Sequence, residues 1–166
     1  SAAALEVLLR AALEVTRADA GFIALMNPNT GFLEVEAAAG LPHPTGELQL
    51  RVSEGLAGWA TRSGRPARVN DVRTEPRYFA LRQQTRAELA APLDVGDQAR
   101  GVLCVMADRT NAFTAADEEW LVELADEAER LIRRLWSFEQ LRLKARLFET
   151  LASVSQAIHS TLNLDD

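Results

Sequence analysis

The sequence is poor in the residues that build metal and thiol chemistry. It holds one cysteine, Cys104, and two histidines, His43 and His159, which lie far apart in the chain. One cysteine cannot form an internal disulfide, which suits a reducing compartment, and a metal site would need clustered ligands. We therefore expect a cytoplasmic protein without a metal site.

Long apolar runs and an excess of positive charge are also missing. No stretch approaches the roughly 20 apolar residues of a membrane-spanning helix, and Glu6 and Arg10 interrupt the apolar N-terminal segment. The 18 basic and 24 acidic residues give a net charge of -6. Neither nucleic acid nor an anionic membrane attracts a net anion, so we predict no direct contact with either.

The sequence shows no recognisable set of catalytic side chains. It has no glycine-rich phosphate loop before a helix and no paired acid and base. Cys104 lies in an apolar segment, where burial keeps a thiol protonated and inert. On these grounds we predict that the chain is not an enzyme and has no catalytic residues.

The patterns that are present begin with a helix and two hairpins. Apolar residues at helical spacing predict an amphipathic helix over residues 3–17. From Gly21 to Arg109, short apolar runs alternate with turn residues, which predicts one hairpin from "GFIALM" and "FLEVEAAA" and another from "ELAAPLDV" and "ARGVLCVMA". Short helices, loops and one strand, "ARVND", are expected between them.

The remaining residues predict one long helix. No glycine or proline follows Gly101, and Thr114 and Asp117 have the spacing of a capping box, so a helix is predicted from Phe113 toward Leu162. A compact domain of this size needs no helix of that length, so part of it is expected to project. Apolar residues along it have the spacing of a coiled-coil seam: Leu131, Leu135, Phe138, Leu141, Ala145 and Phe148. A homodimer would cover this seam; the alternative is that residues 138–162 fold back on their own domain.

Several segments, in this order and spacing, resemble a GAF domain across residues 3–136. They are the first helix and hairpin, "GLAGWATRSGRPARVNDVRTEPRYF", "ELAAPLDVGDQARGVLCVM" and "FTAADEEWLVELADEAERLI". The resemblance implies an α+β fold: a six-stranded antiparallel sheet, terminal helices on one face, and a pocket under short helices and loops on the other. The tail "LFETLASVSQAIHSTLNLDD" resembles the opening helix of a further GAF domain. We therefore assign residues 1–136 to a sensory domain and 137–166 to a signalling helix that runs into a second one.

The same resemblance implies a set of ligand-binding residues. In ligand-binding members, residues after the first glycine of the "GLAG" element touch the ligand through their backbone, which here gives Leu56 and Ala57. The two glycines would let the backbone approach a ligand, or would instead serve tight packing of a short helix. The other residues placed toward the pocket, its rim and its lid are Phe22, Ala38, Ala39, Trp59, Asp71, Tyr78, Phe79, Thr85 and Cys104. Their aromatic rings could stack on a planar ligand or simply fill the core.

Two features bear on the chemistry of the ligand. Seven arginines lie within residues 62–86, against Asp71 and Glu75. They favour an anionic ligand if several converge on the pocket mouth, and an ordinary solvated surface if they do not. The Asn-Lys pair of cyclic-nucleotide-binding GAF domains is absent, since its position holds Ala107 and Asp108, or Asp108 and Arg109. The sequence therefore names neither the ligand nor any cofactor.

From these observations we predict a small-molecule-sensing regulatory domain in signal transduction. It would pass the state of its ligand along a dimeric C-terminal helix. The alternative is a ligand-free dimerisation and relay scaffold of a histidine kinase, a cyclic-dinucleotide enzyme or a transcriptional regulator. The two differ in whether the pocket is open or filled by its own side chains.

Overall fold

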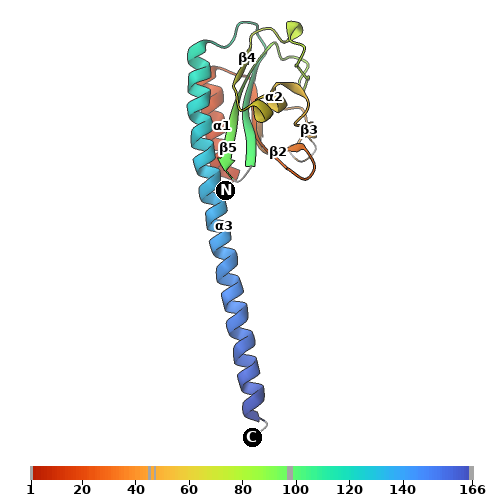
Figure 1. Cartoon of the computed structure of the whole chain (residues 1–166). Coiled ribbons are helices and arrows are strands. Elements are labelled where there is room, and N and C mark those ends of the chain that lie inside the picture. The colour runs from red at the N-terminus through yellow and green to blue at the C-terminus, as the bar shows by residue number, and fades with distance from the viewer. Residues whose placement is uncertain (1, 45, 47, 97–98, 165–166) are drawn as a thin grey trace. The chain divides into compact units, whose positions relative to one another are not determined.

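Six antiparallel strands form one sheet in the order β3-β2-β1-β6-β5-β4 (Figure 1). The strands are β1 (Ala20–Met26), β2 (Phe32–Ala39), β3 (Leu50–Arg51), β4 (Ala67–Val69), β5 (Ala87–Gly96) and β6 (Ala99–Ala107). Both predicted hairpins are present, as β1 with β2 and β5 with β6, and "ARVND" contains β4. The sequence did not predict β3, which has too few residues for an alternating pattern.

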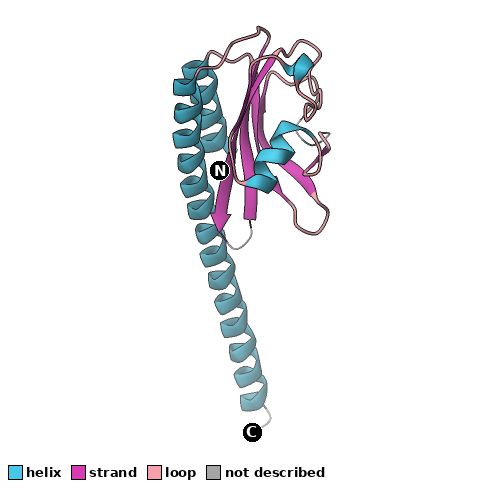
Figure 2. Cartoon of the chain, turned by 45° about the horizontal axis from the view of Figure 1, so that its top comes forward, coloured by secondary structure: helices cyan, strands magenta, loops and turns pink. Residues whose placement is uncertain are grey.

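The computed structural model describes residues 2–44, 46, 48–96 and 99–164. The chain divides after Leu131 into two compact units. In the first unit, α1 (Ala2–Thr16) and the first part of α3 (Ala115–Leu164) cover one face of the sheet (Figure 2). The helix α2 (Gly55–Ser63) and the loops around it cover the other face. This arrangement confirms the predicted fold, with the terminal helices opposite the short one.

The register of the central strands decides which side chains face α2. Phe22 lies opposite both Ala38 and Cys104, and all three belong to the cluster of side chains on the α2 side. The preceding residue, Gly21, faces α1: a Cβ atom there would lie 3.3 Å from Leu9 and 3.2 Å from Leu13. The pairing of β1 and β2 is irregular after Ile23, and the register shifts there. The alternation of side chains between the two faces of the sheet therefore does not continue along β2 past this point.

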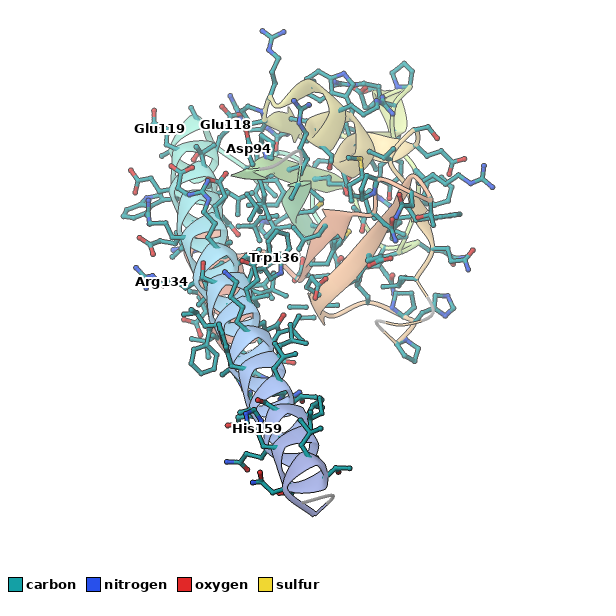
Figure 3. All side chains as sticks on the ribbon, turned by 60° about the horizontal axis from the view of Figure 1, so that its bottom comes forward. Asp94, Glu118, Glu119, Arg134, Trp136 and His159 are labelled. Atoms are coloured by element: carbon teal, nitrogen blue, oxygen red, sulfur yellow. The ribbon has the colours of Figure 1, made fainter. Side chains whose placement is uncertain are left out.

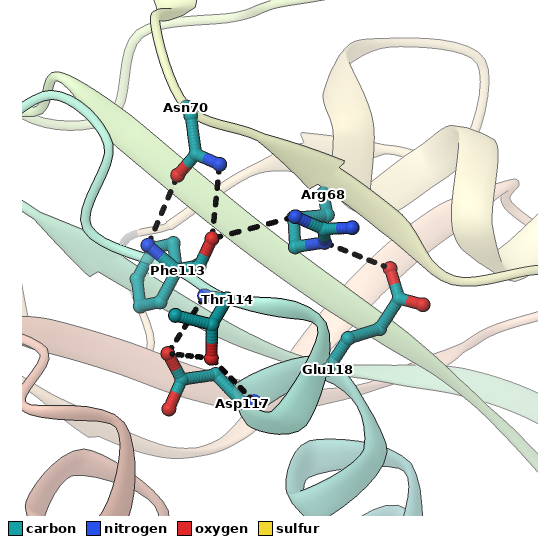
Figure 4. Close-up of polar contacts among 6 residues, drawn as sticks. All are labelled: Arg68, Asn70, Phe113, Thr114, Asp117 and Glu118. Carbon is teal, nitrogen blue, oxygen red and sulfur yellow. Dashed lines mark hydrogen bonds and ion pairs between the residues drawn. The ribbon is translucent and has the colours of Figure 1, made fainter.

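The start of α3 has the predicted capping box (Figure 4). The hydroxyl of Thr114 accepts a hydrogen bond from the Asp117 amide at 3.1 Å, and the Asp117 carboxylate accepts one from the Thr114 amide at 2.8 Å. Thr114 thus precedes the first helical turn, so α3 begins at Ala115 rather than at Phe113. Acidic side chains such as Glu118 and Glu119 near this end suit the helix dipole (Figure 3).

The second unit consists of the remainder of α3, which continues without a break to Leu164. Arg134, Trp136 and His159 lie along this part of the helix (Figure 3). From Trp136 onward its large apolar side chains are exposed: Trp136, Phe138, Leu141, Leu143, Leu147, Phe148, Leu151, Val154, Ile158 and Leu162. The coiled coil stays a prediction. Across the described residues, no helix has a stretch apolar and long enough to span a membrane.

The helix α2 packs closely on the chain at Gly58. A Cβ atom on Gly58 would lie 2.5 Å from the carbonyl oxygen of Val52 and 3.0 Å from that of Arg51. Backbone atoms cannot move aside as a flexible side chain can. The second glycine of "GLAG" is therefore required for tight helix packing, which was one of the two interpretations open from the sequence.

We predict that Gly58→Ala destabilises the protein by at least about 1 kcal/mol. Helix propensity alone would raise the free energy of unfolding of the variant by about 1 kcal/mol. A decrease would therefore show that the steric clash outweighs the gain in propensity. The measurement is urea denaturation followed by circular dichroism. Gly46→Ala is the control, since nothing lies within 4 Å of its added Cβ and its φ is not positive. A Gly58→Ala variant as stable as the wild type would contradict the packing argument.

Candidate ligand-binding site

A small cavity lies between the sheet and the start of α2. About 20 Å³ is open to the centres of water molecules, which is room for about one water. The lining residues are Leu33, Leu50, Arg51, Glu54, Gly55, Leu56, Ala57, Phe79, Leu81 and Glu88. The walls are therefore mainly aliphatic, and a buried carboxyl group, that of Glu88, is among them.

Glu88 is buried on β5, with 3% of its surface exposed. One carboxyl oxygen, Oε1, accepts a hydrogen bond from the Cys104 thiol at 3.1 Å. The other, Oε2, is also buried and has no hydrogen-bond partner within the described part of the chain. Burial raises the pKa of Glu88 to about 7, and the hydrogen bond from Cys104 offsets this only in part.

Two neighbours of Glu88 are also affected by burial. The pKa of the Cys104 thiol is raised well above its usual value, first by burial and then by the adjacent Glu88 charge. Burial also raises the pKa of Tyr78, and the nearby Glu88 charge raises it further. Both groups therefore stay protonated near neutral pH, and Glu88 is the member of this group that can change charge there.

The structure brings part of the predicted site together. Leu56, Ala57 and Phe79 line the cavity, as the resemblance implied. Phe22 and Cys104 lie on the same side of the sheet but are fully buried in the core, and Ala38 is packed against that core. Phe79 is 46% exposed, so it is the most exposed of the apolar residues that line the cavity.

Trp59 and Tyr78 line a different feature, an open surface groove shared with Phe79. The Arg77 guanidinium lies 4.4 Å from the centre of the Trp59 ring and also pairs with Glu75. The Trp59 ring therefore contacts Arg77 at the surface groove, and Trp59 is not among the described residues that line the inner cavity.

Three predicted residues lie elsewhere. Asp71 caps the short helix η2 (Val72–Thr74) and holds Arg73 with both carboxyl oxygens, which lowers the pKa of Asp71. Thr85 is buried and accepts a hydrogen bond from Arg82. Ala39 pairs with Gly21, and paired residues point to the same face, so Ala39 faces α1 and not the cavity.

The arginines of residues 62–86 do not converge on the cavity, and none of the seven is among the described residues that line it. Arg73 and Arg77 pair with their neighbours Asp71 and Glu75, and Arg82 pairs with Asp108. Three others bond to backbone carbonyls: Arg62 to Val52, Arg68 to Phe113, and Arg86 to Gln83 and Thr85. These arginines therefore give no support to an anionic ligand in this cavity.

Sequence reasoning missed Glu88, along with Leu33, Leu50 and Leu81. The segment "AELAAPL" did carry a signal for Glu88, because it places one charged residue in an otherwise apolar strand. A strand that is covered on both faces cannot expose that charge to water. The position of the two leucines from β2 and β3 depends on the curl of the sheet, which has no local signal.

A family model described as a GAF domain matches residues 2–133. The chain belongs to the GAF domain family. Protein YtsP of Bacillus subtilis (strain 168) is 26% identical over 85 residues, which are 51% of this chain. The match spans 52% of that relative, about half of its length.

Solved structures show the same fold. The GAF domain of a phosphoenolpyruvate-protein phosphotransferase from Coxiella burnetii superposes with a TM-score of 0.75 at 22% identity, covering 84% of this chain and 86% of that one. Type II free methionine-R-sulfoxide reductase from Thermoplasma acidophilum superposes with a TM-score of 0.70 at 22% identity, covering 80% and 92%. At this identity the likeness concerns the fold alone.

The likeness to the reductase overturns the prediction about catalysis. Free methionine-R-sulfoxide reductases are enzymes, and further members with this name are among the similar structures. The prediction that this GAF domain is not an enzyme is therefore wrong. It took the family to be purely regulatory, whereas the fold also carries catalysts.

We predict that Glu88 makes stability fall as the pH rises. Between pH 4.5, its ordinary pKa, and about pH 7, the folded protein holds a proton on Glu88 that the unfolded chain has lost. The free energy of unfolding should therefore drop across this window, by about 3 kcal/mol in total, and level off above it. Glu88→Gln, which has no such proton, should be more stable than the wild type at pH 8 and similar at pH 5.

The measurement is urea denaturation of both proteins at pH 5, 6, 7 and 8. Glu119→Gln, on the exposed surface of α3, is the control and should follow the wild type at every pH. If the difference between wild type and Glu88→Gln is the same at all four values, Glu88 does not titrate in this window.

Proposed function

We propose that this GAF domain is a small-molecule-binding regulatory module that passes the state of its ligand to α3. The observation that carries the proposal is the cavity under α2, which joins an aliphatic wall to one buried carboxyl group. Ligand sites are typically apolar hollows with a few placed polar groups. The half-exposed Phe79 at its edge provides a way for the cavity to open.

A polar connection links the region of α2 to the start of α3 (Figure 4). The strand β4 follows α2 directly, and the Asn70 side chain after it donates to the Phe113 carbonyl at 2.9 Å and accepts from the Phe113 amide at 3.0 Å. Arg68 on β4 adds an ion pair with Glu118 at 3.5 Å. A shift of α2 on ligand binding would therefore be felt at the first turn of α3. For this coupling to transmit anything, the ligand must bind the two arrangements with different affinity.

The exposed side chains of the second unit support a homodimer through α3. Leu147, Leu151, Val154 and Ile158 are more than half exposed and are spaced by four, three and four residues. This spacing places them on one helix face, as in a coiled-coil seam, and this face is a different one from the seam predicted from Leu131 to Phe148. A second copy of the same helix offers a matching apolar face, which a single copy leaves in water.

We predict that the protein, purified gently from its native host, carries a noncovalent small molecule. Native mass spectrometry should show a mass above that of the chain, and the excess should vanish under denaturing conditions. Glu88→Gln, purified in the same way, keeps the aliphatic walls and tests whether the mass depends on the cavity. A wild type that is clean in every preparation would favour the ligand-free scaffold.

We predict that Leu151→Glu weakens the dimer at least tenfold. Leu151 is 64% exposed, so the change adds a charge to the proposed seam without disturbing a core. Sedimentation velocity over a range of concentrations would give the dissociation constants. Gln156→Glu adds the same charge on the opposite side of the helix and should leave the dimer intact. Equal masses for the wild type and Leu151→Glu at all concentrations would refute a dimer through this face.

A further inference from the structure

The unpartnered oxygen of Glu88 restricts what the cavity can accept. A buried carboxyl oxygen without a hydrogen bond is unfavourable, and the described residues leave Oε2 in that state. Oε1 is already engaged by the Cys104 thiol, which is a weak donor. An occupant that brings a hydrogen-bond donor to Oε2 would therefore remove this cost.

The nearby cations are committed to other groups. The side chain of Arg82 is only 9% exposed, and its Nη1 donates to Asp108 at 2.9 Å and to Thr85 at 3.3 Å. Arg51, which lines the cavity, lies over the Phe32 ring at 5.6 Å and is exposed. Among the described residues, Glu88 forms no ion pair with either arginine or with any other cation.

We propose that the cavity selects a small aliphatic molecule bearing a protonated amine, whose N–H group donates to Oε2 of Glu88. This rests on the proposed function, because it names the ligand class of the same site. A neutral amide would satisfy the hydrogen bond but not the charge, whereas an ammonium group satisfies both. Once Glu88 is ionised, above its pKa of about 7, a carboxylate would face it with the same charge and without a donor. The leucines at positions 33, 50 and 56 would enclose the aliphatic part.

The size of the cavity adds a second requirement. Its present volume holds about one water, so an aliphatic amine can enter only if Phe79 and Leu81 move outward. Gly55, at the start of α2, has a positive φ of 72°, and a Cβ there would lie 3.1 Å from Phe79. Movement of this edge is therefore expected to change the backbone amide signals of Leu56, Ala57 and Leu81 when the amine binds.

The test uses three probes of equal chain length, butylammonium, butyramide and butyrate, at pH 8, where Glu88 is ionised, and at matched ionic strength. Each is titrated into the ¹⁵N-labelled full chain, and the amide signals of Leu56, Ala57 and Leu81 report binding. Butylammonium should bind at least ten times more tightly than either of the others. Glu88→Gln should lose at least tenfold in butylammonium affinity.

Glu34→Gln is the matched control, because Glu34 is exposed, follows the lining residue Leu33 in the chain and is not among the described residues that line the cavity. It should change the butylammonium affinity by no more than about twofold. If Glu34→Gln weakens binding as much as Glu88→Gln, general charge attraction explains the result and the inference is wrong. The same holds if butyramide or butyrate binds as tightly as butylammonium, a comparison that needs no variant.

The proposed function fails in a different way. If none of the three probes changes the signals of the cavity residues, the cavity does not open, and the proposed binding function falls together with its ligand class. Binding of all three probes with equal affinity would leave the binding function standing and overturn only the preference for an amine.

Discussion

Because the central strands are buried on both faces, every polar side chain on or near them must find a partner. The described part of the chain has four buried polar side chains: Thr16, Thr61, Thr85 and Glu88. Thr16 and Thr61 donate to backbone carbonyls one helical turn earlier, and Thr85 accepts from Arg82. Glu88 alone keeps an atom without a partner. The cost of that atom is what distinguishes the cavity from the rest of the core.

Close contacts at both ends of α2 tie this helix to the rest of the first unit. Gly58 brings the helix into backbone contact with Val52, so α2 cannot shift without moving the chain that leads out of β3. At its other end, α2 is followed within a few residues by β4, whose Arg68 reaches the first turn of α3. A helix packed this tightly moves as a body, because backbone contacts leave no room for gradual adjustment. In the proposed function, an opening of the cavity would reach the start of α3 along this route.

Most of the fold could be predicted from the sequence, because its signals are local. Turn residues between apolar runs define the hairpins, and Thr114 with Asp117 defines the start of α3. The face assignments could not be predicted, because both faces of the strands are apolar and the irregularity after Ile23 shifts the register. Ala39 was misplaced for this reason. The charge at Glu88 was visible in its strand, but whether each oxygen has a partner depends on side chains that only the folded chain brings together.

The charges around the cavity bear on the condition that the sequence left open for an anionic ligand. Seven arginines in one segment would favour such a ligand if they converged on the site, yet six of them pair with carboxylates or bond to backbone carbonyls elsewhere. Pairs at the surface are screened by water and contribute little to the field inside a cavity. An unscreened carboxyl group in the apolar wall acts at short range and with little competition from solvent. Under the proposal, a single buried Glu88, once ionised, would set the electrostatic preference of the site more strongly than the arginines that outnumber it.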